Sequence, residues 1–339
     1  MLKWSGMAHS SYYYRPTIGK RGRKPSTHTL MQDGSLVSNA TVVLAMRFIL
    51  AEEFVCYGYS KTTDELRENG FIINYKKCYR LMKEHRLLCG HVIRPAAGGG
   101  KRKFVNWRVQ QASKPMEQLC MDIKYVHIHG QNRNALLLTV LDVYTRSIVG
   151  QVLWWQMRKE HVIWLIHHIL GQHQDVTTSI TLRNDNGSQF IAYALREYLQ
   201  DKGVRQEFIH VATPEENCFI EAYHSILQRE LLDPRQFESI GQAQEVFERW
   251  QVFYNERRRH DSLQGSRPAR VWKLYEQHQP GAEQPMKEEM KLYPQNGSRK
   301  SPQIGGGRFV DKIVREQKTA IFEDQRAQNA QTVPGNPSS

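Results

Sequence analysis

The stretch Leu119-Cys-Met-Asp-Ile-Lys-Tyr-Val126 is decisive for the fold, because it places one carboxylate inside an apolar run with the character of a β-strand. A second apolar run, residues 179–185, ends at Asp185 and is followed by the turn-forming sequence Asn186-Gly-Ser-Gln189. Glu221 lies in a helical pattern over residues 215–230, and positions 186 to 220 put 35 residues between it and Asp185. The three acidic residues therefore belong to three different predicted elements.

These carboxylates have the chemistry of a divalent-metal site. Phosphodiester chemistry with two Mg²⁺ ions needs hard oxygen ligands that converge from separate elements, with water and phosphate oxygens completing each shell. For a single Asp or Glu, a solvated surface charge is the usual alternative. That alternative fits Asp122 poorly, because a carboxylate centred in an apolar strand is costly without a cation or hydrogen bonds. We therefore predict that Asp122, Asp185 and Glu221 bind metal.

Other segments accompany this acidic pattern along the chain. They are Tyr57-Gly-Tyr-Ser60, Cys78-Tyr-Arg-Leu-Met82, Met121-Asp-Ile-Lys-Tyr-Val126, Leu141-Asp-Val-Tyr-Thr-Arg-Ser-Ile-Val-Gly150, Asn184-Asp-Asn-Gly-Ser-Gln-Phe190, Asn217 to Glu221, and Tyr254-Asn-Glu-Arg-Arg-Arg-His-Asp-Ser-Leu263 with Pro268. In this order they resemble the transposases of bacterial insertion sequences, of the second-reading-frame type, whose DDE catalytic core belongs to the retroviral-integrase superfamily. The resemblance covers about residues 40–275.

The resemblance implies a fold, an activity and a set of partners. The fold is α/β: a ribonuclease-H-like core, with a mixed five-stranded sheet and flanking helices, preceded by a small all-α helix-turn-helix domain. The activity is DNA 3′-end cleavage and strand transfer at terminal inverted repeats, with Asp122, Asp185 and Glu221 as catalytic residues and ligands of two Mg²⁺ (or Mn²⁺) ions. The partners are double-stranded DNA, further copies of the chain on paired DNA ends, and the upstream-frame protein of the same element.

Charge and cysteine usage agree with a DNA-binding protein of a reducing compartment. The net charge is +13, and residues 1–118 hold 20 Lys+Arg against 8 Asp+Glu, which leaves 27 against 26 for the rest. A basic surplus confined to the N-terminal third predicts a polyanion partner, although a solubilising arm is the alternative. The 5 cysteines form no C-x-x-C pair, and no apolar run reaches the length of a membrane helix. We expect a bacterial cytoplasmic protein that associates with the nucleoid and not with membranes.

Composition and periodicity divide the chain into five parts. We expect a basic flexible arm over residues 1–40, a helix-turn-helix domain over 41–92, a linker over 93–116, the catalytic core over 117–275 and a low-complexity, disordered tail over 276–339. Within the core, the predicted strands cover 118–128, 135–142, 147–155, 178–184 and 205–210, and the predicted helices cover 159–172, 188–202, 215–231 and 240–256.

The N-terminal helices carry the expected DNA contacts. We predict a helix over 39–55, a second opened by the capping box Thr62-x-x-Glu65, and a third capped by Asn74 and ending near Leu88. In the third helix the apolar face is Tyr75, Cys78, Tyr79 and Met82, and the basic residues are Lys76, Lys77, Arg80 and Lys83. This pattern is typical of a recognition helix that neutralises phosphates, and an ordinary solvated face is the alternative.

Further residues near the acidic set receive supporting or structural roles. We expect Asp142 to hold the turn that follows it, with Arg146 as a partner, and not to bind metal. Asn217 lies one turn before Glu221 on the same helix face. The family commonly has a basic DNA contact seven positions after the Glu, where this chain has Gln228, followed by Arg229. Asn217 and Arg229 are the candidate DNA contacts beside the acidic set.

A basic cluster follows the last predicted core helix. Its members are Arg257, Arg258, Arg259 and His260. We expect Arg258 and His260 to contact DNA phosphates, and a solvated helix end is the alternative.

Two other functions remain open at this point. A copy that keeps the fold and DNA binding but has lost catalysis would also carry these motifs, and Gln228 favours it weakly. A nuclease of the same fold is the other alternative, and the basic N-terminal helices argue against it.

Overall fold

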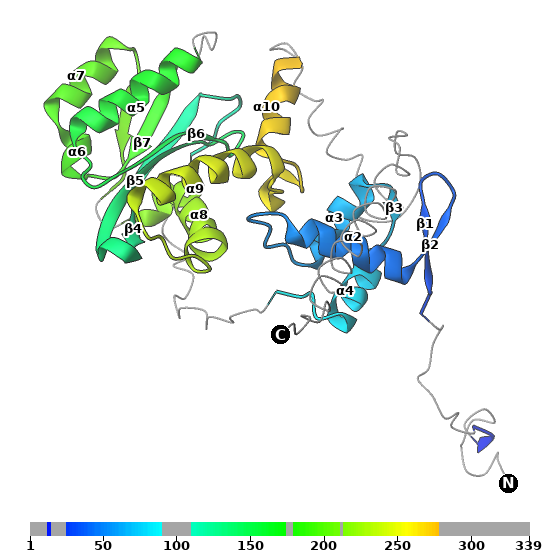
Figure 1. Ribbon diagram of the computed structural model, residues 1–339. Coiled ribbons are helices and arrows are strands. Elements are labelled where there is room, and N and C mark those ends of the chain that lie inside the picture. Colours follow the sequence, from blue (N-terminus) through cyan, green and yellow to red (C-terminus); the bar gives the residue numbers. More distant parts are fainter. Residues whose placement is uncertain (1–11, 15–24, 90–109, 174–178, 211–212, 278–339) are drawn as a thin grey trace, which may run out of the picture.

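The computed structural model describes residues 12–14, 25–89, 110–173, 179–210 and 213–277, which form two lobes (Figure 1). Most of the expected arm and linker, and all of the expected tail beyond residue 277, lie outside the described residues. The first lobe contains the N-terminal helices, and the second contains a five-stranded sheet with helices on both faces.

The N-terminal lobe combines three helices with a small sheet. The helices are α2 (Asn39–Ala51), α3 (Tyr59–Glu68) and α4 (Tyr75–Glu84). The strands are β1 (His28–Met31), β2 (Leu36–Ser38) and β3 (Phe71–Ile72), with β1 antiparallel to both of its neighbours. The sheet is an addition to the expected all-α domain. Residues 28–38 correct the prediction of a flexible arm up to residue 40, because the alternation of buried and exposed residues along β1 joins this hairpin to the helical core.

The helix starts in this lobe are partly as predicted. Asn74 caps α4, with its side chain accepting a hydrogen bond from the Lys77 amide. The predicted capping box was wrong, because α3 begins at Tyr59 after Gly58. Thr62 therefore lies inside the helix, where its hydroxyl donates to the Gly58 carbonyl.

The second lobe has a ribonuclease-H-like fold, as expected. The sheet order is β6-β5-β4-β7-β8. Strands β4 (Gln118–Ile128), β5 (Arg133–Asp142) and β6 (Ile148–Trp154) form an antiparallel meander, and β7 (Thr181–Asn184) and β8 (Arg205–Phe208) are parallel to β4. This order of three antiparallel strands followed by two parallel ones confirms the mixed five-stranded sheet.

The period-2 pattern of β4 explains how helices cover both sheet faces. Leu119 and Met121 pack with α5 (Lys159–Gln172), α6 (Ser188–Ile191) and α7 (Tyr193–Asp201), whereas Cys120 packs with α8 (Cys218–Leu227) and α9 (Ile240–Val252) on the other side. The predicted helix over 188–202 is interrupted at Ala192, whose ψ of 131° is not helical. A further helix, α10 (Pro268–Gln277), follows the predicted core helices.

The two lobes are joined by an aromatic contact and by ion pairs. Phe54, from the loop after α2, packs against Trp250 with ring centroids 5.5 Å apart and belongs to the core of the second lobe. Glu65 on α3 accepts a hydrogen bond from Arg259 Nε at 2.7 Å, and Glu68 pairs with both Arg259 and Arg267. The N-terminal lobe is therefore packed on α9 and on the segment that follows it.

Candidate active site

Strands β4 and β7 bring Asp122 and Asp185 to the same edge of the sheet. The parallel pairing places Cys120 opposite Arg183, so each Asp lies two residues beyond this pair. One Asp122 oxygen accepts from the Ile123 amide at 2.8 Å, and one Asp185 oxygen accepts from the Gly187 amide at 3.0 Å. The local backbone thus fixes one oxygen of each carboxylate.

Glu221 reaches the same place from α8. This helix packs on β4 and β5 through Ile220, Tyr223 and Leu227. Ligand atoms of Asp122, Glu221 and His224 all lie within 4.8 Å of one another. Asp122 of β4 and Glu221 of α8 therefore come together, and Asp185, just after β7, lies near enough for its charge to act on Asp122.

The carboxylates repel one another. Burial, together with the negative charges of Asp185 and Glu221, raises the pKa of Asp122 to about 7, although the Ile123 amide and the charge of Lys124 oppose this rise. Among the described residues, no Lys or Arg lies within ion-pair distance of these acidic groups. A site with this uncompensated charge is suited to divalent cations.

His224 is a member of this group that the sequence reasoning missed. It lies three residues after Glu221, on the same face of α8, and is only 6% exposed. Its Nδ1 is 3.6 Å from Oδ2 of Asp122. Burial lowers the pKa of His224 to about 3, so its imidazole is neutral at ordinary pH. The i, i+3 spacing from Glu221 was a usable signal in the sequence.

Asp142 has the structural role that was expected. It accepts hydrogen bonds from the Thr145 amide at 2.7 Å, from the Thr145 hydroxyl and from the Met116 amide at 2.9 Å. The Arg146 guanidinium donates to the Val143 carbonyl and lies over the Phe219 ring, 3.9 Å from its centroid. The prediction that Asp142 holds the turn is confirmed.

The turn after Asp185 has little room for a side chain at position 187. Gly187 has a φ of −59°, which any residue can adopt, so its backbone freedom is not the reason for a glycine. A Cβ at this position would lie 3.1 Å from Oδ1 of Asp185 and 2.4 Å from the Gln189 side chain. Gly187 therefore leaves room beside the Asp185 carboxylate.

Arg183 is a second residue that the sequence reasoning missed. Its buried guanidinium binds Glu207 on β8, and Nη1 donates to the Glu216 carbonyl at 2.6 Å. Glu216 lies in the turn that leads into α8, so Arg183 connects the sheet to the helix that carries Glu221. A charged residue between Leu182 and Asn184 in a short buried strand was the available signal.

The supporting residues on and after α8 differ in exposure. Asn217 is buried just before α8, and its Oδ1 has no hydrogen-bond partner among the described residues. Gln228 donates to Asp233 and belongs to the π-helical turn after α8. The Arg229 side chain is 66% exposed and pairs with Glu230 at 3.3 Å, so it remains accessible to a ligand.

The basic cluster after α9 lies largely inside the protein. Arg258 is 2% exposed and donates to both Glu230 oxygens at 2.7 Å. His260 is 5% exposed, and its ring packs on Tyr254. This corrects the expectation of phosphate contacts from Arg258 and His260, because neither side chain reaches the surface. Arg257 is more open and pairs with Glu52.

The basic face of α4 is divided between internal bonds and solvent. Lys77 Nζ donates to the His28 carbonyl at 2.6 Å, and Arg80 pairs with Glu84 and donates to the Ser26 carbonyl. Lys76 and Lys83 are exposed. The buried face is Cys78, Leu81 and Met82, so Leu81 takes the place predicted for Tyr79, which stacks edge-on against Tyr59.

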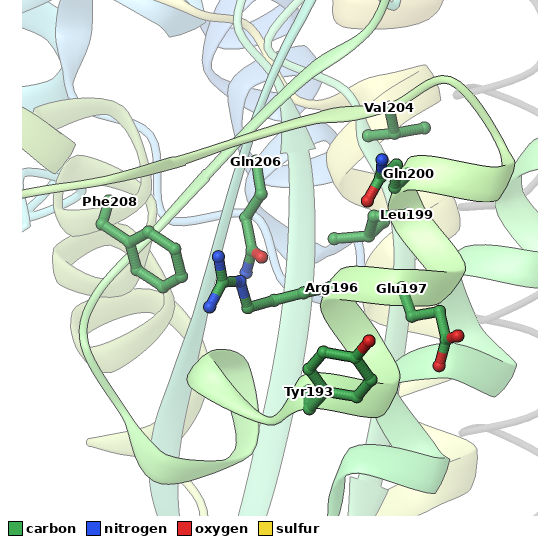
Figure 2. A pocket seen from close by; sticks show the side chains of 8 residues that line it. All are labelled: Tyr193, Arg196, Glu197, Leu199, Gln200, Val204, Gln206 and Phe208. Carbon is green, nitrogen blue, oxygen red and sulfur yellow. The ribbon is translucent and has the colours of Figure 1, made fainter.

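A pocket of about 540 Å³ lies elsewhere in the core, between α7 and β8 (Figure 2). Arg196, Tyr193 and Phe208 line it, together with Gln206, whose amide donates to Asn184 and Phe190. None of its lining residues belongs to the acidic group. Among the residues that the structure describes, no helix is long and apolar enough to cross a membrane.

Solved structures to which this chain is similar include a retroviral intasome and a transposase. A chain of the simian T-cell lymphotropic virus intasome in complex with PP2A regulatory subunit B56 gamma aligns with a TM-score of 0.44 at 12% identity, over 70% of this chain and 76% of that one. The catalytic domain of the Mos1 mariner transposase aligns with a TM-score of 0.34 at 12% identity, over 47% of this chain and 74% of that one.

Known domain families match the sequences of both lobes. The HTH-like domain family matches residues 39–94, and the integrase core domain family matches residues 112–214 and, in a second form, 202–268. The uncharacterized 39.2 kDa protein of insertion element IS476 from Xanthomonas euvesicatoria is 28% identical over 244 residues, covering 71% of this chain and 67% of its own. The transposase of insertion sequence element IS904 from Lactococcus lactis is 25% identical over 224 residues, covering 62% of this chain and 85% of its own. The chain thus has an HTH-like domain ahead of an integrase core, and the relatives to which it is similar are proteins of insertion elements.

Proposed function

We propose that this protein is a DNA transposase that binds the terminal inverted repeats of its element and catalyses 3′-end cleavage and strand transfer. The observation that carries the proposal is that Asp122 and Glu221 lie together, with the charge of Asp185 acting on Asp122, while no Lys or Arg among the described residues forms an ion pair with them. Three carboxylates held together at this cost in repulsion are typical of a polynucleotidyl transferase of this family.

The donor atoms fit divalent cations. All three proposed ligands offer carboxylate oxygens, which Mg²⁺ and Mn²⁺ prefer. The Asp122 side chain is 18% exposed and Glu221 is exposed, so water and a DNA phosphate can reach them. We propose that Asp122, Asp185 and Glu221 would hold two such ions between them.

When bound, such ions polarise the scissile phosphate and stabilise the attacking and leaving oxygens. The residues of this chain supply position. The Ile123 amide donates to one oxygen of Asp122, and the Gly187 amide donates to one oxygen of Asp185. The second oxygen of each carboxylate can therefore turn towards a ligand. In end cleavage, water attacks phosphorus and the 3′ oxygen of the element leaves. In strand transfer, that 3′-hydroxyl attacks a target phosphodiester and displaces the target 3′ oxygen.

DNA binding is assigned to the exposed cations. We propose that Lys76 and Lys83 on α4 contact phosphates, with Lys77 and Arg80 orienting the helix through their bonds to Ser26 and His28, and that Arg229 contacts DNA near the active site. Asn217 is buried just before α8, so we propose that it supports this helix and acts on DNA only indirectly. Assembly on paired ends and cooperation with an upstream-frame protein belong to the same proposal.

The test is a cleavage and strand-transfer assay on labelled element-end DNA with Mg²⁺. Glu221→Gln should reduce the rate at least about a thousandfold, because the lost electrostatic stabilisation is worth several kcal/mol and each 1.4 kcal/mol or so is tenfold. Glu215→Gln is the matched control, because Glu215 is an exposed acid just before α8 and lies outside the acidic group. The upstream-frame protein is supplied in parallel.

Each outcome separates the proposed function from its alternatives. Activity that is lost in Glu221→Gln, with DNA binding retained, supports the transposase. Specific binding without activity under any condition would instead identify a derivative that has lost catalysis. Cleavage of RNA–DNA hybrids or junctions in preference to element ends would identify a nuclease.

A further inference from the structure

His224 is placed between the proposed metal ligands. It projects from α8 one turn beyond Glu221, and its Nδ1 faces Oδ2 of Asp122 across 3.6 Å. This separation is too long for a good hydrogen bond. The nitrogen of His224 and the oxygens of Asp122 and Glu221 form a group with no member more than 4.8 Å from another. Ligands on opposite sides of a Mg²⁺-sized ion lie about 4.2 Å apart, so only a small contraction is needed.

The ordinary roles of a buried histidine do not account for this side chain. Its Nδ1 lies too far from Oδ2 of Asp122 for a good hydrogen bond, and its Nε2 is buried without a hydrogen-bond partner among the described residues. A buried imidazole in this position beside two carboxylates is the donor set of a metal site in which one ligand is nitrogen.

We propose that His224 is a direct ligand of the cation held by Asp122 and Glu221, which makes this one of the two metal positions a carboxylate–imidazole site. The inference rests on the proposed function, because it adds a ligand to the metal site assigned there. Asp185 lies outside the three-residue group, so the second position keeps oxygen ligands only. The two positions then differ in chemistry.

The consequence is a metal preference. Imidazole suits first-row transition metals, whereas Mg²⁺ prefers oxygen and demands near-octahedral geometry. We expect His224 to favour Mn²⁺ over Mg²⁺ at this position. Loss of even a hydrogen-bond partner of a metal ligand typically costs about tenfold or more in metal affinity. Loss of His224 itself should therefore weaken Mn²⁺ binding by at least about tenfold and Mg²⁺ binding by much less.

The experiment is pulsed electron paramagnetic resonance of Mn²⁺ added to the full-length protein. Nitrogen bonded to Mn²⁺ gives a hyperfine coupling that oxygen ligands do not give. Labelling the histidines with ¹⁵N should change this coupling in the wild type, which needs no variant. His224→Asn should abolish it and weaken Mn²⁺ binding in a titration. His168→Asn is the control, because His168 is exposed on α5 and remote from the acidic group.

The outcomes distinguish this inference from the function on which it rests. Nitrogen coupling that disappears in both His224→Asn and Asp122→Asn supports the ligand assignment. Mn²⁺ that binds in an Asp122-dependent way without nitrogen coupling overturns the role of His224 and leaves the proposed function intact. Absence of Asp122-dependent binding overturns both.

Discussion

Two groups of acidic residues in this protein differ in how their charge is balanced. At the interface between the lobes, Glu230 receives two hydrogen bonds from Arg258, and Glu65 and Glu68 are paired with Arg259 and Arg267. In the candidate active site, Asp122, Asp185 and Glu221 have no such partner among the described residues. The same residue types are therefore structural where an arginine neutralises them and available to a cation where none does.

The contrast appears in the pKa of each group. Burial alone would raise the pKa of Glu230, but the hydrogen bonds and charge of Arg258 hold it below its ordinary value. Burial and like charge raise the pKa of Asp122 to about 7. Glu230 thus stays ionised and stabilises the fold, whereas Asp122 is more easily protonated than an ordinary aspartate.

The largest effect should follow from breaking the neutralised group. Arg258→Met leaves the buried Glu230 carboxylate with only the longer, exposed contact to Arg229, and we expect the free energy of unfolding to fall by about 3–5 kcal/mol. Urea unfolding followed by tryptophan fluorescence measures it, because Trp250 is buried in the same core cluster as Tyr254, over which Arg258 lies. The double variant Arg258→Met/Glu230→Leu should recover most of the loss, since it leaves no buried charge. If the double variant were as unstable as Arg258→Met, the loss would come from the packing of the replaced side chains and not from the unpaired carboxylate.

The opposite effect should follow at the active site. Asp122→Asn removes repulsion, so in EDTA at pH 8 we expect this variant to be about 2–3 kcal/mol more stable than the wild type, somewhat less than full linkage because the site is partly open to water. In the wild type, the pKa of Asp122 is about 7 in the folded state and 3.8 in the unfolded state. The contribution of Asp122 to the free energy of unfolding is therefore fully present below about pH 4 and is lost as the pH rises through about 7. Saturating Mg²⁺ should reduce the difference, because it stabilises only the wild-type site.

The measurement is the difference between wild type and variant in unfolding free energy from pH 4 to 8. The difference is needed because burial lowers the pKa values of His224 and His260, which produces an opposite slope in both proteins. Asp201→Asn, at an exposed position on α7, serves as the control and should change nothing. A wild type that is as stable as Asp122→Asn at pH 8 would contradict the picture of an uncompensated site.

The sequence was most informative where long patterns lie on one buried face. The predicted limits of β4 and α5 agree with the structure, because each has an apolar periodicity over more than ten residues. The convergence of Asp122 with Glu221 was also predictable, since the resemblance fixes their elements. The short strand β1 was missed, because its period is visible only through its pairing with β3.

The partners of the arginines could not be predicted from the sequence. Arg257, Arg258 and Arg259 are adjacent in the chain, but they pair with Glu52, Glu230 and Glu65, which lie in three different elements. Local charge patterning identifies such a run as basic and says nothing of acids that folding brings to it. His224 is different from these arginines, because its spacing of three residues from Glu221 is visible in the sequence itself.

A smaller effect should follow from loosening the joint between lobes. Arg259→Met removes the bonds to Glu65, Glu68 and the Gly265 carbonyl, but Arg267 still pairs with both glutamates. We therefore expect a loss of about 1.5 kcal/mol, at the lower end for hydrogen bonds to charged groups. Hydrogen exchange should show faster opening of α3 with β4 unchanged. Uniformly faster exchange in both lobes would mean that they unfold as one unit.

The smallest effect on stability, and the clearest on function, should come from the cations that no acid neutralises. Among the described residues, neither Lys76 nor Lys83 forms an ion pair, whereas the similarly exposed Arg257 is paired with Glu52. Replacing Lys76 or Lys83 with Ala should change stability by less than about 0.5 kcal/mol and lower the dependence of DNA affinity on salt by about one unit in the log–log slope. Arg257→Ala should leave that slope unchanged, because releasing a counterion from DNA requires a cation that is not already committed to a carboxylate. An equal decrease of the salt slope in all three variants would show that DNA displaces Glu52 from Arg257. The distinction between neutralised and available charges would then apply to the acidic residues of this protein but not to its arginines.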